Sequence, residues 1–177
     1  MRVLGIDPGL GRTGVAVVEG RAGSLRLVAA DCLETDAAQG DGVRLLELSR
    51  RLVQVAAEAH PDVAAVERLF FSTNRATAMR VSEARGVILC AMAEAGVPVV
   101  EYTPNEVKES VTGYGGATKH QVTRMSASLL GVESIAGPDD TADACAVAIC
   151  HHHRAGLRGG LPGRRCRHGC RHFLLFL

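Results

Sequence analysis

The sequence predicts an α/β domain built on a mixed five-stranded sheet that is flanked by helices. Three β-rich runs open the chain, the apolar spacing then changes to that of helices, and later strands alternate with helices. Strands joined by short turns pair antiparallel, whereas strands joined through a helix run parallel, so both kinds of pairing are expected. With 177 residues, 47% of them hydrophobic, the chain suits one such core and leaves little room for a second.

The expected strands are short and end at turn residues or at carboxylates. The first run ends at Asp7, directly before the turn at Pro8 and Gly9, and the third follows a turn at 20–24. The fourth run consists of four apolar residues and ends at Glu67. The strands are expected over 2–7, 13–19, 25–33, 63–67 and 97–102.

Helical spacing and helix-ending residues define the remaining elements. A helix that begins near Gly42 stops at His60, because Pro61 disfavours a helical conformation in the residue before it. Gly137 and Pro138 introduce the last helix, with Asp139 at the N-cap position. The other helices are expected over 74–95, 104–111 and 119–130.

One folded domain is expected over residues 1–153, and residues 154–177 are expected to form an irregular tail rich in arginine and histidine. The three histidines at 151–153 suit a helix C-terminus better than a metal site. Residues 151–177 hold six arginines and no acid, which leaves 14 basic and 19 acidic residues in the rest. The folded part is therefore acidic, which argues against nucleic-acid binding by bulk charge alone.

No apolar run approaches the roughly 20 residues of a membrane helix, and the N-terminus runs straight into a strand, so we expect a cytoplasmic protein without membrane contact. Six cysteines are present, and the first four lie in apolar segments where a reduced thiol packs as a small hydrophobe. These four are Cys32, Cys90, Cys145 and Cys150.

Four acidic residues stand where strands end and where the last helix begins. If the first and fourth strands are neighbours, the carboxylates of Asp7 and Glu67 converge. Asp140 and Asp143 are three residues apart and share one face near the positive end of the last helix. Crowded carboxylates repel unless cations keep them ionised, and Mg²⁺ prefers oxygen ligands. Two such ions activate a water and stabilise the leaving oxygen in phosphodiester hydrolysis.

Other interpretations stay open for these acids. Taken alone, Asp7 also suits the start of a Pro-Gly turn, and Asp140 suits a helix start. Sugar kinases and actin-like ATPases likewise open with an Asp-x-Gly turn, but they close two domains around a nucleotide and this chain supplies one. A catalytically inactive DNA-binding module and a related nuclease that acts on RNA are further alternatives.

The motifs together resemble the RuvC family of bacterial Holliday junction resolvases, over about residues 1–153. They are Gly5-Ile6-Asp7-Pro8-Gly9 with Thr13-Gly14, Val66-Glu67-Arg68-Leu69-Phe70 and Asp140-Thr141-Ala142-Asp143-Ala144, with Ala84-Arg85-Gly86 and Glu101-Tyr102 between them. The resemblance implies an RNase H-like fold, a homodimer and two Mg²⁺ ions in each active site, which Mn²⁺ can replace. It further implies paired symmetric nicks across a four-way DNA junction, in recombination and repair, beside the RuvA–RuvB branch-migration complex.

The resemblance also implies roles for individual residues. Asp7, Glu67, Asp140 and Asp143 match the catalytic acids and metal ligands of the family. Phe70 matches an aromatic residue that contacts junction bases. Lys108 and Lys119 match lysines that hold backbone phosphates, and on charge alone Arg68, Arg75 and Arg124 join them.

The helix expected over 74–95 predicts the dimer contact. Small and apolar residues cover more of its surface than one buried face needs, among them Met79, Val87 and Cys90. A two-fold dimer would present two active sites to two symmetry-related strands of a junction.

Overall fold

The computed structural model describes residues 1–68 and 75–157, and in this part five strands form one sheet in the order β3-β2-β1-β4-β5. The strands are β1 (Arg2–Asp7), β2 (Arg12–Arg21), β3 (Ser24–Glu34), β4 (Val63–Glu67) and β5 (Val99–Tyr102). The first three strands pair antiparallel, while β4 pairs parallel with both β1 and β5. The predicted mixed five-stranded sheet is confirmed.

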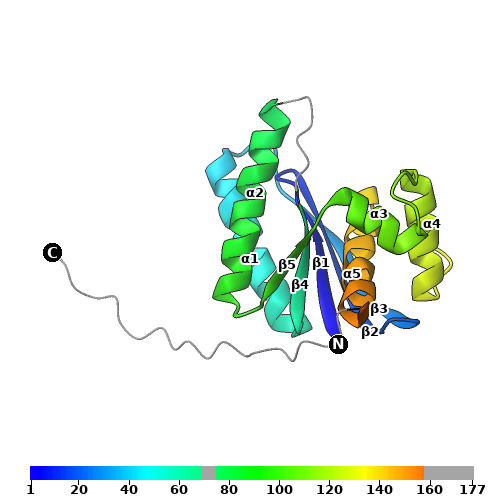
Figure 1. The fold of residues 1–177 in the computed structure, drawn as a ribbon. Helices are drawn as coiled ribbons and strands as arrows, with labels where there is room; N and C mark the ends of the chain where they lie inside the picture. Colours follow the sequence, from blue (N-terminus) through cyan, green and yellow to red (C-terminus); the bar gives the residue numbers. More distant parts are fainter. Residues whose placement is uncertain (69–74, 158–177) are drawn as a thin grey trace.

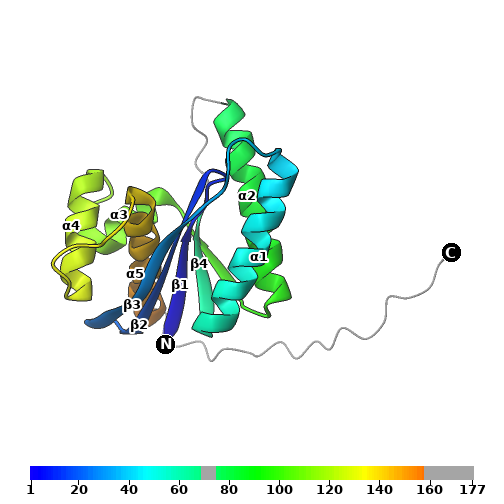
Figure 2. The same ribbon diagram turned by 180° about the vertical axis from the view of Figure 1, so that it is seen from behind.

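Helices cover both faces of this sheet. In the described ranges they are α1 (Asp41–Ala59), α2 (Arg75–Glu94), α3 (Pro104–Thr112), α4 (Lys119–Leu130) and α5 (Asp139–Leu157). Helices α1 and α2 lie on one face and α3, α4 and α5 on the other, as Figure 1 and the rear view in Figure 2 show. A separate hydrophobic cluster fills each layer. Because both faces are covered, β1 and β4 are buried at successive positions instead of alternating.

Two glycines allow α5 to pack directly on the sheet. A β-carbon at Gly5 of β1 would lie 2.1 Å from the carbonyl oxygen of Ala144, and one at Gly14 of β2 would lie 1.9 Å from that of Asp140. Both distances are far below van der Waals contact, so only glycine fits at these strand positions. The two glycines therefore bring the first turns of α5 against the ends of β1 and β2.

Histidines hold the C-terminal part of α5. His151 Nδ1 lies 2.9 Å from the hydroxyl of Tyr102, and His152 Nε2 lies 3.1 Å from the carbonyl oxygen of Val18. The next histidine contacts a carbonyl oxygen of α3 in the same way. Burial lowers the pKa of His151 to about 4, so its ring is neutral at pH 7. We expected these residues as charges at a helix end, and the structure instead packs the first two inside, 7% and 2% exposed.

Several boundaries differ by one or two residues from those expected, and three differences have a clear cause or consequence. Helix α5 continues to Leu157, and Arg154 near its end places Nη1 3.0 Å from Glu106 Oε1 of α3. Strand β5 begins two residues late, because the N–H of Val97 still bonds a carbonyl at the end of α2. Asp139 is the first residue of α5 and not the residue before it.

The described cysteines differ in burial, and only some of them pack in the core as expected. Cys145 and Cys150 are buried as expected, and burial raises the pKa of both. Cys90 is exposed, so its expected packing in the core is wrong: it lies on the outer face of α2. Neither described range contains a helix with the length and hydropathy of a membrane span.

Candidate active site

Asp7 and Glu67 lie side by side at one edge of the sheet. Each is the last residue of its strand, and β1 and β4 are parallel neighbours in which Ile6 pairs with Val66. The next residue along each strand therefore reaches the same edge, and the two carboxyl groups are close enough to share a hydrogen bond. The parallel register alone accounts for this convergence.

Both carboxyl groups are held in their protonated form more strongly than in water. Burial, then the negative charges of Glu67, Asp143 and Asp140, raise the pKa of Asp7 to about 8. Burial and the charge of Asp143 raise the pKa of Glu67 to about 7, although Asp7, Lys108 and Lys119 act in the opposite direction. Desolvation and like charge together are thus stronger than the cations nearby.

Asp140 and Asp143 reach this edge from α5, three residues apart on one helix face. Cationic side chains of the chain itself lie beside both: Arg12 Nε is 3.2 Å from Asp140 Oδ2, and Lys119 Nζ is 2.9 Å from Asp143 Oδ2. Yet Asp140 Oδ2 is buried and receives no directed hydrogen bond from the residues that the structure describes. The guanidinium of Arg12 neutralises this oxygen without satisfying it.

These observations test whether the acidic edge fits a divalent ion. Carboxylate oxygens are the ligands that Mg²⁺ and Mn²⁺ prefer, and all four candidate ligands are carboxylates, whereas zinc sites use thiols and imidazoles. The raised pKa values of Asp7 and Glu67 show that positive charge is missing beside these two acids, and Asp140 Oδ2 still lacks a directed donor among the described residues. Within residues 1–68 and 75–157 no three such groups already form a closed ligand set. The donor set fits a hard cation.

Lys119 is positioned by the start of α4. Thr118 caps the helix: its side chain accepts a hydrogen bond from the N–H of Gln121, and the Gln121 side chain accepts one from the N–H of Thr118. Partial burial disfavours the charged form of Lys119, but its hydrogen bond to Asp143 and the charges of Asp143 and Asp139 outweigh this and raise its pKa. Lys119 is therefore a permanent cation at the acidic edge.

The other predicted DNA contacts have different outcomes. Lys108 on α3 is near enough to act on the charge of Glu67. Arg68 is exposed directly after β4, and its N–H bonds the carbonyl oxygen of Tyr102. Phe70 lies outside the described residues. Arg75 begins α2, but its side chain is outside the description as well.

Arg12 is the site residue that sequence reasoning missed. It follows the Pro-Gly turn closely, and the buried side chain of Thr13 closes this turn with a hydrogen bond to the carbonyl oxygen of Gly9. In the sequence, its position alone could have pointed to it, because Arg12 is a cation that follows Asp7 directly after the Pro-Gly turn. Nothing local in the sequence pairs it with Asp140, because that contact depends on how α5 packs on β2.

Comparisons with known proteins agree with this arrangement. The family model of the crossover junction endodeoxyribonuclease RuvC matches residues 3–151. RuvC of Chloroflexus aggregans is 50% identical over 155 residues, which are 88% of this chain and 94% of that protein. RuvC of Moorella thermoacetica is 48% identical over 151 residues, 85% of this chain and 90% of that protein.

A solved structure is similar as well. RuvC of T. thermophilus in complex with a Holliday junction substrate has a TM-score of 0.85 at 34% identity, over 89% of this chain and 96% of that chain. The range matched by the family model contains all four carboxylates and both lysines described above.

Proposed function

Because the chain belongs to the RuvC family of crossover junction endodeoxyribonucleases, we propose that it resolves four-way DNA junctions in recombination and repair. Hydrolysis of one phosphodiester bond in each of two opposite strands is the reaction that such resolution needs. The observation that carries this proposal is the edge at which half-buried Asp7 and Glu67 lie together without enough positive charge. A polyanionic substrate can be cut there only if cations are added.

The family is metal-dependent, and we propose two Mg²⁺ ions for each active site, replaceable by Mn²⁺. Asp7, Glu67, Asp140 and Asp143 would hold them through hard carboxylate oxygens. When bound, such ions lower the pKa of an attacking water and stabilise the charge of the leaving oxygen. The roles of these four acids rest on their shared edge, on burial and on the match to the family.

The chain's own cations have a separate part in the proposal. Lys119 and Lys108 would hold backbone phosphates beside the carboxylates, because both already act on the charges of this edge. If a metal ion held Asp143, the Nζ of Lys119, now 2.9 Å from Asp143 Oδ2, would be free for a phosphate oxygen. Phe70 and Arg75, just after β4 in the chain, remain the proposed contacts to junction bases and to a neighbouring phosphate.

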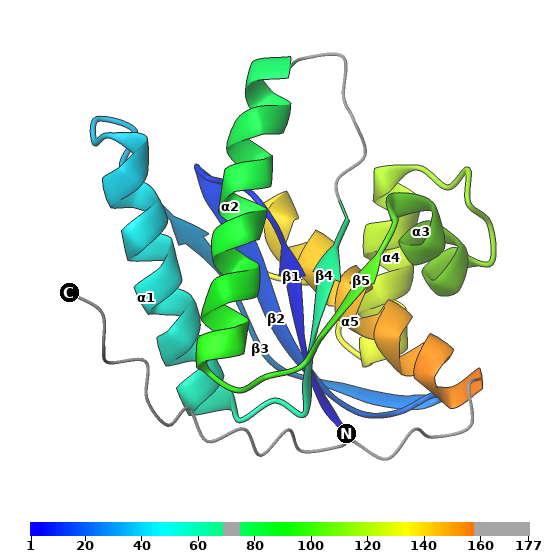
Figure 3. The ribbon, with the colours of Figure 1, turned by 60° about the vertical axis from the view of Figure 1, so that its left-hand side comes forward.

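We propose a homodimer formed through α2. Its inner face packs on the sheet with Ala84, Ile88 and Ala91 fully buried. Along the outer face Met79 is 65% exposed, Cys90 is exposed, and a side chain at Gly86 would meet no atom within 4 Å. Figure 3 shows α2 in front of the sheet beside α1. This smooth outer face suits close approach of a second copy about a two-fold axis.

A charge on that face tests the dimer. Cys90→Glu is expected to yield a monomer in light scattering at a concentration where the natural chain is dimeric. Val28→Glu, at an exposed apolar position of β3, is the matched control and is expected to leave the dimer intact. A natural chain that is monomeric and still cuts both strands would overturn this part of the proposal.

Location and further partners follow from the proposed substrate. A junction resolvase acts where bacterial DNA is recombined, so we place the protein in the cytoplasm. The family resemblance also implies work beside the RuvA–RuvB branch-migration complex on the same junction.

Cutting of a synthetic four-way junction tests the proposed function. With Mg²⁺ present, we expect symmetric nicks in two opposite strands of the DNA junction, and none after chelation. A linear duplex of the same sequence and a four-way RNA junction are the controls. Equal cutting of the linear duplex, a preference for the RNA junction, or binding without cutting at any divalent ion would contradict the proposal.

A further inference from the structure

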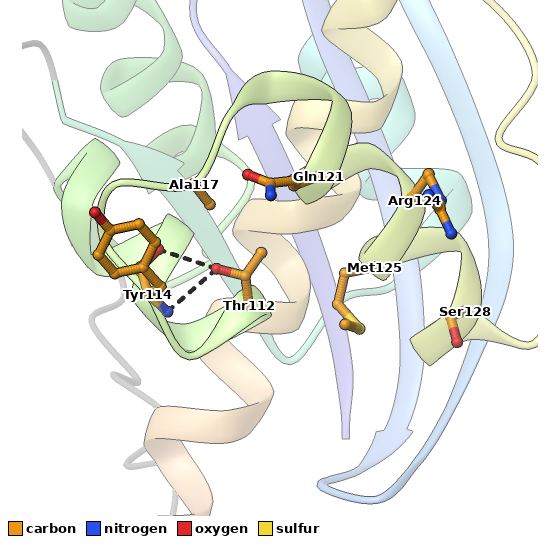
Figure 4. A pocket seen from close by; sticks show the side chains of 7 residues that line it. All are labelled: Thr112, Tyr114, Ala117, Gln121, Arg124, Met125 and Ser128. Carbon is orange, nitrogen blue, oxygen red and sulfur yellow. Dashed lines mark hydrogen bonds between the residues drawn. The ribbon is translucent and has the colours of Figure 1, made fainter.

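A pocket between the end of α3 and the exposed side of α4 has the chemistry of a nucleotide site (Figure 4). It encloses roughly 370 Å³, a volume typical of small-ligand pockets. Helix α4 contributes Gln121, Arg124, Met125 and Ser128, whose spacing is that of a single helix face. The loop before α4 contributes Tyr114, and no carboxylate lines the pocket. Its only charge is positive, so it favours an anionic group.

The ring of Tyr114 is both exposed and held in place. It is 68% exposed, yet a β-carbon at Gly116 would lie 2.5 Å from its Cζ and Oη atoms, so the ring lies across that glycine. Thr112 Oγ1 accepts a hydrogen bond from the main-chain N–H of Tyr114 at 3.2 Å, and its one proton is shared between the carbonyl oxygens of Lys108 at 2.8 Å and of Tyr114 at 3.0 Å (Figure 4). A fixed aromatic ring facing solvent is the usual platform on which a nucleobase stacks.

Polar groups of α4 complete the chemistry. Arg124 is exposed and forms no ion pair or hydrogen bond with any residue that the structure describes. The side-chain oxygen of Gln121 is taken up by the cap at Thr118, so its amide nitrogen is what it offers to the pocket. A guanidinium binds a phosphate, and an amide donor bonds a base edge or a sugar oxygen.

The pocket and the acidic edge share helix α4 but lie on different sides of it, because at about 100° per residue the pocket residues of α4 are turned away from Lys119. The cap that fixes Gln121 also fixes Lys119, the first residue of α4, whose Nζ lies 2.9 Å from Asp143 Oδ2. Helix α4 carries Lys119, His120 and Arg124 and no acidic residue. Junction DNA that contacts Lys119 with one phosphate therefore has to pass around α4 to reach Arg124.

From the lining of this pocket we infer that it binds one nucleotide of the bound junction, with its base on the Tyr114 ring and a phosphate on Arg124. The base must lie outside the duplex stack, as bases near a branch point can, because stacking requires an open base face. The inference rests on the proposed function. It adds to the lysines of the acidic edge a second DNA contact, which depends on the position of one base in the junction.

Abasic substitution tests the stacking contact. A series of metal-free junctions, each lacking one base near the branch point, is bound to the natural chain, Tyr114→Ala and Tyr114→Phe. We expect one position at which base loss weakens binding by the natural chain about 5- to 150-fold. Tyr114→Ala is expected to bind the intact junction that much more weakly and to lose this position effect, whereas Tyr114→Phe keeps it. If Tyr114→Ala retains the full position dependence, the inference is wrong.

Salt dependence tests the phosphate contact. Arg124→Ala is expected to lower the slope of log affinity against log salt by about 0.9, the value for one phosphate, while Tyr114→Ala leaves the slope unchanged. Arg21→Ala, at the opposite end of β2, is the matched control. An unchanged slope in Arg124→Ala would contradict the inference. If the natural chain neither binds nor cuts the junction, the proposed function fails first; if it cuts and these variants match it, only this inference fails.

Discussion

The two ends of helix α5 both bury ionisable groups, and they differ in the charge that surrounds those groups. At the C-terminal end, His151 and His152 each place one ring nitrogen against a defined oxygen, and burial lowers the pKa of both rings, so both are neutral; Nδ1 of His152 is buried without a hydrogen-bond partner among the described residues. At the N-terminal end, Asp140 Oδ2 receives no directed hydrogen bond from the described residues, and Asp7 nearby is half-buried among other acids, so that burial and these acids raise its pKa. Neutral groups can be buried at little cost, whereas crowded like charges mark a site that something else completes. The comparison separates structural from functional residues on a single helix.

The largest expected effect comes from removing one acid at the N-terminal end. Asp140→Asn should reduce junction cutting by at least about a hundredfold, because an amide holds a divalent ion less well than a carboxylate. Metal-free junction binding should be equal or tighter, since one negative charge beside the phosphates is gone. Gel-shift and cleavage assays on one labelled junction measure both quantities. Near-normal nicking by Asp140→Asn would remove this residue from the metal site.

The two ends should also respond to pH in opposite directions. Asp7 has a raised pKa of about 8 when folded and 3.8 otherwise, so the folded chain keeps a proton that the unfolded chain has lost between these values. Without metal, the contribution of Asp7 to the free energy of unfolding should therefore fall by several kcal/mol as pH rises from about 4 to about 8. Thermal unfolding in chelator from about pH 5 to about pH 9 measures it. Stability that rises steadily over this range would contradict the account.

Acid should weaken the other end of the helix. Because the pKa of His151 is lowered to about 4 from 6.5, the unfolded chain binds more protons between these values, and stability falls as pH drops through them. His151→Phe should cost about 1 kcal/mol in free energy of unfolding at neutral pH, for the lost hydrogen bond. It should also weaken the dependence on acid while leaving junction cutting unchanged. Urea unfolding of the natural chain and of His151→Phe at several acidic pH values measures this. An equally strong dependence on acid in the variant would contradict the assignment.

The smallest effect is expected at the last turn of α5. Arg154 pairs with Glu106 while both side chains are partly exposed, so Arg154→Ala should lower the free energy of unfolding by only about 0.5 kcal/mol. Added salt should shrink this difference further. Arg21→Ala is the control with no such pair in the described residues. A loss of several kcal/mol would mean that the end of α5 contributes far more than an ion pair.

Much of the fold could be predicted because its signals are local. Turns such as Pro8-Gly9 and the helix end at His60 define element boundaries directly in the sequence. The extension of α5 and the burial of its histidines could not be predicted, since helical periodicity does not show which neighbour covers a helix end. The contacts of Tyr102 and Val18 with these histidines come from distant segments.

The contacts of the site likewise include some that the sequence predicts and some that it does not. Convergence of Asp7 and Glu67 follows from parallel strands that end together, so it could be stated from the strand pattern once the two strands were taken as neighbours. The contact of Arg12 with Asp140 depends on the glycine at position 14, which lets α5 approach β2. Such a contact requires the packed structure.

The central claim is that the missing positive charge at the acidic edge is supplied by divalent metal. The most direct measurement compares thermal unfolding of the natural chain and Asp7→Asn at about pH 8, where Asp7 is half ionised, with and without Mg²⁺. Asp7→Asn should be the more stable chain without metal, because repulsion is relieved, and Mg²⁺ should stabilise the natural chain but not the variant. Equal stabilisation of both chains by Mg²⁺, or a less stable metal-free variant, would contradict the account.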